Sequence, residues 1–267
     1  MSGFFCIRGK LTVQSQRAIE LIGAIVFLGL WQLASGTIIP SSILPSPVQV
    51  VMAFPELHVK DAIIYNSIYS IKLNTMGLLE AVAFALPLGM LIGLFPLCRA
   101  LTERYVTAAR FLPLTAVVGL FIAWFGIDMN MKVQFLAFAI FIYLLPVVIQ
   151  KVDGMEEVLV QTVRTLGAST YQTVRTIFVP GVISRVFDDI RVLAALSWTY
   201  IVVAEMVNAG GGGVGALTYI AARQSRIDKV FAILLVIVLI GFVQDQMLKL
   251  IDSIAFPYKY AKARSNR

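Results

Sequence analysis

The chain has 267 residues, of which 59% are hydrophobic and only 14% are charged. A soluble globular domain carries about 45–50% apolar and about 25% charged residues, so this chain has too little polar surface to cover itself in water and is predicted to be an integral membrane protein. Its formal net charge of +7 comes from basic residues spread over short loops and tails, without a basic-aromatic platform, so no nucleic acid partner is expected.

Apolar runs of about 20 residues predict about six spanning helices. The first, 19–38, follows three basic residues and is too long for the apolar region of a signal peptide, so a retained helix is favoured. The other five are expected at 63–94, 105–124, 133–149, 192–207 and 230–251. Prolines between 40 and 57 predict that the loop after the first helix contains no regular helix.

Lysines and arginines in the short loops predict the orientation, because they gather on the cytoplasmic side. Placing both termini inside puts roughly 16 of the 22 basic residues on that side. In the opposite, external loops, Arg223, Arg226 and Lys229 cluster against this trend. The chain then divides into a cytoplasmic segment 1–18, a transmembrane domain 19–258 with a cytoplasmic loop 150–189, and a basic cytoplasmic tail 259–267.

The cytoplasmic loop 150–189 is predicted to form two short helices. Gly167 ends the first, and Ser169 with Gln172 fits the capping-box pattern at the start of the second. Pro180 is expected to stop the second helix, because the residue before a proline is biased away from the helical region. The result is a compact helical elbow outside the bilayer.

Within this loop, the run "LGASTYQTVRTIFVPGVI" resembles the EAA loop of ATP-binding-cassette importer permeases. Gly167, Ile177 and Pro180 take the places of the family's glycine, aliphatic residue and proline. The family's leading Glu-Ala-Ala falls on three other residues, Gln161, Thr162 and Val163. The first helix therefore departs from the family pattern, whereas the turn and the second helix keep it.

Three further segments, "LPSPVQVVMAF", "RFLPLTAVVGLFIAWFGID" and "YIVVAEMVNAGGGGVGALTYIA", resemble permeases for nitrate, sulfonate, taurine and bicarbonate. The likeness covers about residues 40–258. It implies the type I importer fold, all-α and polytopic with a cytoplasmic coupling elbow, among the lipids of a bacterial inner (plasma) membrane. It also implies three kinds of protein partner: a second permease subunit, cytosolic ATPase subunits and an extracytoplasmic solute-binding protein.

The same resemblance implies a function by alternating access. The chain would form the path of a small solute, an anion such as nitrate, sulfonate, taurine or bicarbonate, and couple its movement to ATP hydrolysis on a separate subunit. The sequence has no G-x-x-x-x-G-K-[ST] phosphate-binding loop, so the chain is not expected to be an enzyme, and no cofactor or metal is expected. The residues implied in ATPase coupling are Arg164, Leu166, Gly167, Ala168, Ser169, Tyr171, Ile177 and Pro180.

Lys72, Asn74 and Glu205 are the candidate residues of the translocation path. An ionisable group at membrane depth costs at least ~2.5–3.5 kcal/mol, so Glu205 is expected to face protein or a cavity, either bonded across helices, with Lys72 as one partner, or lining the path. Lys72 either extends to the interface or faces an anionic solute. Asn74 shares one helix face with Ser67 and Ser70, and such a polar stripe lines either a helix contact or a cavity.

A self-sufficient secondary transporter or channel is the alternative. It predicts internal repeats, broken helices and several intramembrane charges, whereas the sequence shows no obvious repeat, and we assign only Glu205 and Lys72 to the interior of spans. The glycine run 210–213 is interpreted as a turn or flexible gate at the external side, and the basic external loop favours an anionic solute.

Overall fold

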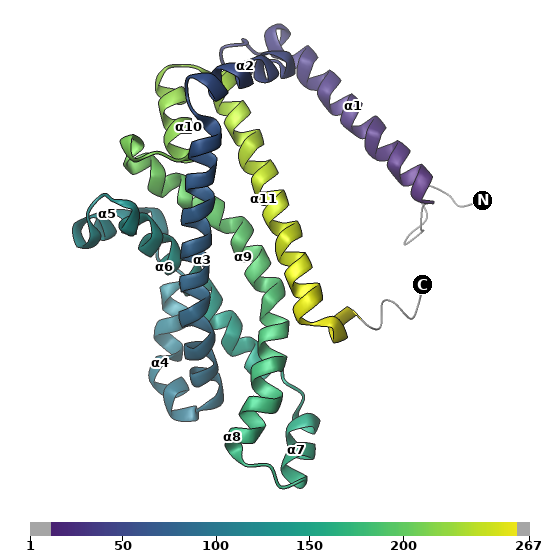
Figure 1. The fold of residues 1–267 in the computed structure, drawn as a ribbon, viewed down its shortest axis with the longest axis vertical. Coiled ribbons are helices and arrows are strands. Elements are labelled where there is room, and N and C mark those ends of the chain that lie inside the picture. Colours follow the sequence, from purple (N-terminus) through teal and green to yellow (C-terminus); the bar gives the residue numbers. More distant parts are fainter. Residues whose placement is uncertain (1–11, 261–267) are drawn as a thin grey trace. The chain divides into compact units, whose positions relative to one another are not determined.

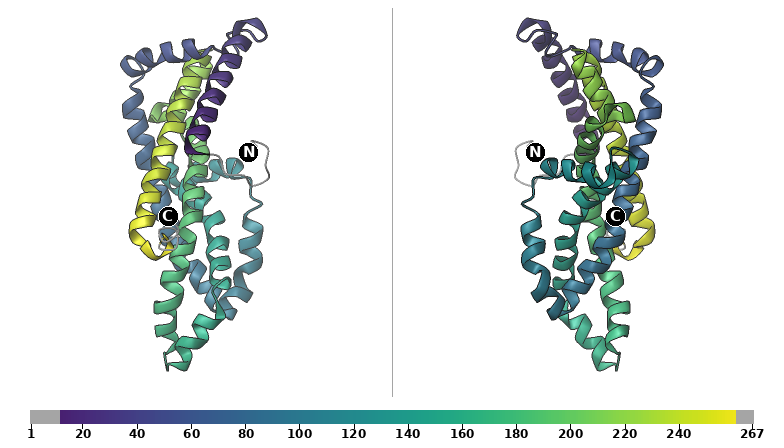
Figure 2. Two further views of the ribbon diagram at one scale, coloured as in Figure 1. Left: turned by 90° about the vertical axis from the view of Figure 1, so that its right-hand side faces the viewer. Right: turned by 90° about the vertical axis from the view of Figure 1, so that its left-hand side faces the viewer.

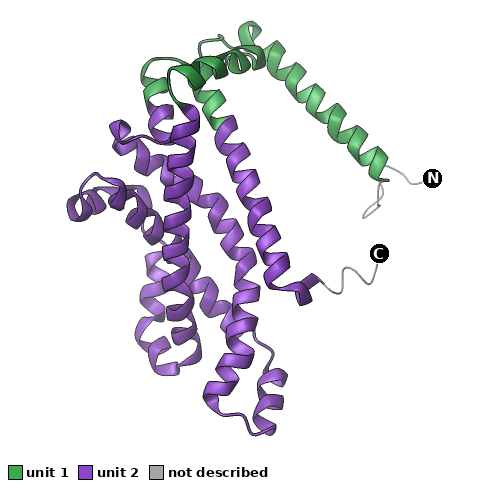
Figure 3. Ribbon diagram, viewed as in Figure 1, with its two compact units in different colours: residues 1–62, 220–234 green, residues 63–219, 235–267 purple. Residues whose placement is uncertain are grey.

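The computed structural model describes residues 12–260, and over this range the regular structure is helical apart from one isolated bridge between Ser35 and Ile39. The chain forms two compact units, residues 1–62 with 220–234 and residues 63–219 with 235–267 (Figure 3). The predicted terminal segments 1–18 and 259–267 lie mostly outside the described residues. The helices in chain order are α1 (Val13–Thr37), α2 (Pro47–Val59), α3 (Ile63–Leu94), α4 (Pro96–Ala109), α5 (Leu114–Phe125), α6 (Met129–Asp153), α7 (Glu157–Thr165), α8 (Thr170–Thr173), the π-helical η1 (Val174–Phe178), α9 (Val179–Val207), the 3₁₀ turn η2 (Ala209–Gly211), α10 (Val214–Arg223) and α11 (Ile227–Ala255) (Figure 1).

The predicted all-α polytopic fold is confirmed. Between residues 12 and 260, five helices are long and apolar enough to cross a membrane, or six if the bent pair α4 and α5 forms one span. The helix predicted at 63–94 has the bounds of α3, and α6 and α11 contain the predicted spans 133–149 and 230–251. The spans therefore follow from the apolar runs of the sequence.

The single helix predicted at 105–124 is wrong. The chain instead forms α4 and α5, which meet at an angle of 107°. Pro113 is the N-cap of α5, with an extended ψ of 100°, so the break falls where proline both lacks an N–H and disfavours helical geometry in the residue before it.

The loop predicted between 40 and 57 also contains a helix, α2. Pro47 is at its first turn, where the missing N–H of proline costs nothing, and Ser46 with Gln49 forms a capping box. The prolines were interpreted only as helix breakers, whereas at this position one of them helps to start a helix.

The prediction that the second helix ends at Pro180 is also wrong, because the chain is helical without interruption from Thr170 to Val207. The π-helical η1 ends at Phe178, two residues before Pro180. A proline ring inside a helix clashes with the carbonyl four residues earlier, and a wider π-turn at this point accommodates it. The span predicted at 192–207 is thus the far end of a much longer helix.

The core of the second unit is built on the close packing of α3 against α6 (Figure 1). Small residues recur every fourth position along the face of α3 that meets α6, namely Gly77, Ala81, Ala85, Gly89 and Gly93. A Cβ atom built on Gly89 would lie 2.6 Å from Cβ of Val148 on α6. Small residues at such spacing let two membrane helices approach closely, which strengthens their van der Waals contact.

We expect Gly89→Ala to destabilise the helix pair by about 1–3 kcal/mol, because the added methyl overpacks a contact with no space for it. The measurement is the apparent Tm of the purified chain in detergent. Gly119→Ala is the matched control, since a Cβ atom at this exposed position on α5 has nothing within 4 Å. Equal Tm values for the two variants would contradict the packing argument.

Candidate coupling elbow and buried polar clusters

The elbow between α6 and α9 consists of α7, a tight turn and α8. Gly167 has a φ of +85° in this turn, its N–H donates to the Arg164 carbonyl, and the Ala168 N–H donates to the Val163 carbonyl. This is the Schellman pattern, which ends a helix on a left-handed residue, usually glycine. The predicted capping box is also present, with Ser169 Oγ accepting from the Gln172 N–H at 3.3 Å.

Two large side chains are exposed at the tip of this elbow. Leu166, the C-cap of α7, is 82% exposed, and Tyr171, in α8, is 70% exposed. Arg164 is exposed beside them and forms no ion pair with any described residue. Apolar and aromatic groups held out on a rigid turn are typical of a protein interface. The elbow protrudes at one end of α9 in each view (Figures 1 and 2).

Glu205 lies at the opposite end of α9 and is fully buried. Its carboxylate accepts a hydrogen bond from Ser70 Oγ on α3 at 2.6 Å and another from the Gly215 N–H at 2.8 Å. Ser70 Oγ in turn accepts from the Val214 N–H at 2.9 Å, and Asn66 Oδ1 accepts from the Gly213 N–H at 2.7 Å. The run of glycines is thereby fastened to α3 and α9 through its backbone.

Lys132 completes this arrangement, which we call the glycine-loop cluster: Asn66, Ser70, Lys132, Glu205 and the loop 211–215. The Lys132 side chain is buried on α6, with Nζ 3.4 Å from the Gly212 carbonyl and 5.2 Å from the centre of the Tyr69 ring. The sequence suggested Lys72 as one partner of Glu205. Lys72 is exposed instead, and the donors to Glu205 are a hydroxyl and a backbone amide.

Asn74 is buried in a second polar cluster that joins three helices. Its amide donates to Ser197 Oγ on α9 at 2.7 Å and accepts from Gln244 Nε2 on α11 at 3.1 Å. Gln244 also accepts from Trp198 Nε1 at 2.7 Å. At this position the polar stripe of α3 lines a helix contact, where interhelical hydrogen bonds hold membrane helices together.

Asp245 and Glu80 are among the carboxylates within spans that were overlooked in the sequence. Asp245 on α11 forms a two-pronged ion pair with Arg191 on α9. Glu80, in the middle of α3, accepts a hydrogen bond from Gln134 Nε2 on α6 at 3.0 Å. An acidic residue inside the apolar run 78–94 is itself the signal that should have marked Glu80.

In the first unit, two of the three basic residues predicted to cluster in an external loop are paired with acids. Arg226 contacts Glu56 at 2.9 Å and Asp228 at 2.8 Å, and Lys229 contacts Asp61 at 2.6 Å with its side chain only 5% exposed. Because their charges are compensated locally, Arg226 and Lys229 give little support to attraction of an anionic solute. Their contacts instead tie α2 to the start of α11.

Hydrogen bonds from Arg226 and Lys60 lower the pKa of Glu56 from 4.5 to about 2. A depressed pKa adds stability that is complete above the unfolded pKa and lost as the pH falls through the folded pKa. We therefore expect wild type to have a higher Tm than Glu56→Gln by a constant margin from pH 7 to about pH 5, and this margin to shrink between about pH 4.5 and pH 2. Thermal unfolding across this pH range measures the difference. A margin that does not change with pH would contradict the assignment.

The elbow and the helices on both sides of it lie in a region that matches a known protein family. The family described as "Binding-protein-dependent transport system inner membrane component" matches residues 85–254, which include the elbow and the helices on both sides of it. The chain belongs to this family. It is therefore an ABC importer permease component, a multi-pass protein of the inner membrane, and its transport system includes an ATPase and a binding protein.

The permease has several relatives of similar length. It is 34% identical over 203 residues to a putative ABC transporter permease protein of Methanocaldococcus jannaschii, covering 74% of each chain. It is 27% identical to the putative aliphatic sulfonates transport permease protein SsuC of Bacillus subtilis, over 85% of this chain and 82% of that one. It is 26% identical to the taurine transport system permease protein TauC of Escherichia coli, over 85% and 84% of the two chains.

Solved structures show the same fold at low sequence identity. The permease superposes on a chain of the inward-facing MetNI methionine ABC transporter with a TM-score of 0.62 at 14% identity, covering 72% of this chain and 95% of that one. It also superposes on a chain of an amino acid ABC transporter solved with histidines, with a TM-score of 0.57 at 16% identity and coverage of 75% and 95%. The type I importer fold expected from the sequence agrees with both.

Proposed function

We propose that this permease forms the translocation path of a small solute and that its α7–α8 elbow is the cytoplasmic docking site of the ATPase. The observation that carries the proposal is the exposure of Leu166 and Tyr171 on either side of a turn held by Gly167 and a capping box. A rigid apolar tip of this kind fits into a partner's groove without losing much conformational freedom. Arg164 is available beside it for an acidic group of the partner.

The helix that follows the elbow supports a mechanical role. Thr170 to Val207 is one helical stretch of 38 residues, about 57 Å long. One end carries the elbow and the other carries Glu205 in the glycine-loop cluster. Movement of an ATPase docked at one end is thereby passed to the other end as a rigid-body displacement, which is how closure and opening of the path are coupled to hydrolysis.

The substrate class is supported by the relatives. The names of SsuC and TauC assign aliphatic sulfonates and taurine to those proteins, and we propose that this permease carries a small anionic or zwitterionic solute of that kind. It acts with a second permease subunit, cytosolic ATPases and an external solute-binding protein, and both of its termini are cytoplasmic. The domain division at residues 18, 258 and 150–189 belongs to the same proposal.

The three candidate path residues take different roles in this scheme. Asn74 and Glu205 are fully engaged by hydrogen bonds to neighbouring segments, so they shape the path by fixing the helices and the glycine loop. Lys72 is exposed on α3 and forms no ion pair with any described residue. It is the member of the three that is free to meet a solute or a lipid headgroup.

The test is purification of the permease from its native membrane in mild detergent, with mass spectrometry of the proteins that accompany it. We expect a P-loop ATPase with wild type and its loss from the double variant Leu166→Ser, Tyr171→Ser. The control is Gln161→Ser, which alters another exposed residue of α7 outside the tip. If no ATPase appears while other ABC complexes of the same membrane stay intact, or if the double variant keeps its ATPase, the elbow is not the docking site.

A further inference from the structure

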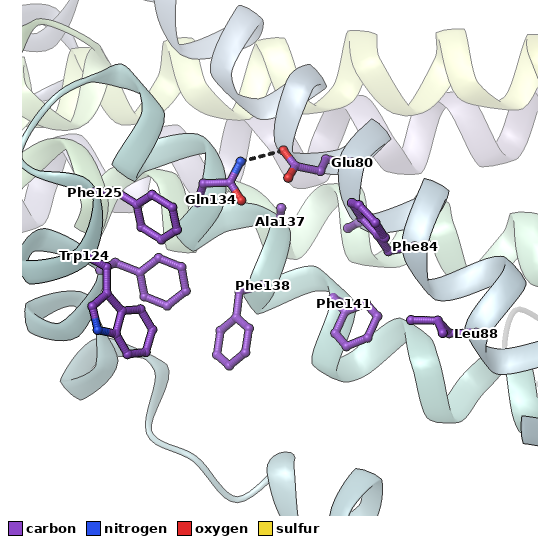
Figure 4. Close-up of a pocket in the computed structure, with 11 residues that line it drawn as sticks. Glu80, Phe84, Leu88, Trp124, Phe125, Gln134, Ala137, Phe138 and Phe141 are labelled. Carbon is purple, nitrogen blue, oxygen red and sulfur yellow. Dashed lines mark hydrogen bonds between the residues drawn. The ribbon is translucent and has the colours of Figure 1, made fainter. Parts of the chain in front are cut away.

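A cavity of about 340 Å³ opens between α3, α5 and α6, within the size range of small-molecule sites. Figure 4 shows Glu80 and Gln134 joined at its polar end, with aromatic rings along the remaining wall. The rings come from the three helices: Phe84, Phe121, Trp124, Phe125, Phe138 and Phe141. The cavity therefore combines one carboxylate with six aromatic side chains.

The rings pack on one another and give the wall a fixed shape. The centre of the Phe121 ring is 5.3 Å from that of Phe138 and 5.7 Å from that of Trp124. The face of an aromatic ring carries the negative part of its quadrupole and attracts a cation placed within about 6 Å of the ring centre. An aromatic wall of this kind can therefore attract a positively charged group that lies over the face of one of its rings.

The carboxylate of Glu80 forms no ion pair with any described residue. Asp245 is paired with Arg191, and Glu205 is bonded by a hydroxyl and a backbone amide in a closed cluster. Among the described residues, Glu80 has only the neutral amide of Gln134 as its hydrogen-bond partner, and no Lys, Arg or His lines the cavity. A carboxylate at membrane depth normally faces a partner charge or a pathway.

We propose that this cavity binds the positively charged nitrogen of a small organic solute. Glu80 supplies the opposite charge, Trp124 and the phenylalanines supply cation–π contacts, and Gln134 orients the carboxylate. A purely anionic solute is repelled by Glu80, so nitrate and bicarbonate do not fit, whereas the ammonium end of a zwitterion does. The inference rests on the proposed function, because it assigns one end of the solute to a position along the path.

The experiment uses the full chain in lipid nanodiscs and the fluorescence of Trp124, which lines the cavity. The probes are choline and 3,3-dimethylbutan-1-ol, which have nearly the same shape and differ in the positive charge. We expect choline to change the emission saturably, the neutral alcohol to bind about tenfold or more weakly, and ethanesulfonate to leave the emission unchanged. Trp124→Phe should abolish the choline signal.

The deciding variant is Glu80→Gln, which keeps the shape of the side chain and removes its charge. It should weaken choline about tenfold or more, while Glu103→Gln, an exposed acid on α4 that does not line the cavity, should bind like wild type. Equal affinity for choline and its neutral isostere, an unaffected Glu80→Gln variant, or saturable binding of ethanesulfonate would each overturn the proposal.

A second readout separates this inference from the proposed function. Co-purification of the ATPase should survive Glu80→Gln, and choline binding should survive Leu166→Ser, Tyr171→Ser, because the cavity and the elbow share no residue. If wild type binds choline but no ATPase co-purifies with it, the proposed docking role of the elbow fails and the cavity inference stands. If the ATPase co-purifies with wild type but choline does not bind, the cavity inference alone fails.

Discussion

Gly213→Ala is expected to destabilise the permease by about 3 kcal/mol or more. Gly213 has a φ of +107°, which an L side chain rarely adopts, and a Cβ atom there would lie 2.2 Å from Cδ of Glu205. The methyl group therefore has to displace the carboxylate from the Ser70 hydroxyl and the Gly215 amide. Leaving buried polar groups without partners adds about 1–3 kcal/mol to the cost of the strained backbone.

The control is Gly210→Ala, three residues earlier in the same run. Its Cβ atom would meet only Asn208 Oδ1, at an ordinary 3.8 Å, and its φ is not in the left-handed region. Apparent Tm in detergent and hydrogen exchange of residues 208–218 measure both variants. We expect faster exchange and a lower Tm for Gly213→Ala alone. Equal values for both variants would show that the glycine-loop cluster does not need a side-chain-free backbone at this point.

The spans were predictable because long apolar runs are a local property of the chain. The run 63–94 has no strong breaker except Pro87, and α3 covers it from end to end. The helix boundaries that were predicted wrongly all involve proline, whose effect on a helix depends on the surrounding structure. Pro47 starts a helix, Pro113 separates two, and Pro180 is accommodated behind a π-turn. A single rule for proline cannot distinguish these three outcomes.

The buried clusters were less predictable, because their members are far apart in the sequence. Glu205 was singled out, but its donor Ser70 is 135 residues away in the sequence. Its other donor is a backbone amide, which cannot be recognised from the type of residue. Lys132 is one residue from the start of an apolar run, so its position relative to the membrane depends on where α6 begins. Composition shows that a buried charge needs a partner, while the fold decides which one.

The second large effect is expected at the opposite end of the long helix, where Gly167→Val should reduce the co-purified ATPase about tenfold or more. Gly167 has a φ of +85°, and a Cβ atom there would meet nothing within 4 Å. The change is therefore a test of backbone conformation alone. A left-handed residue costs a side-chain-bearing amino acid roughly 1–2 kcal/mol, more for a β-branched one, so valine should open the turn and redirect α7 relative to α8.

Gly167→Asn is the matched variant, because asparagine tolerates the left-handed region better than other side chains. We expect it to keep the ATPase at nearly the wild-type level, measured by mass spectrometry of the purified complex. Both variants should retain the Tm of the isolated chain, since Gly167 is exposed and lies outside the packed spans. If Gly167→Val keeps its ATPase as well as Gly167→Asn does, the direction of the elbow is not what the partner recognises. The exposed side chains Leu166 and Tyr171 would then carry the docking by themselves, on a turn that adjusts when the ATPase binds.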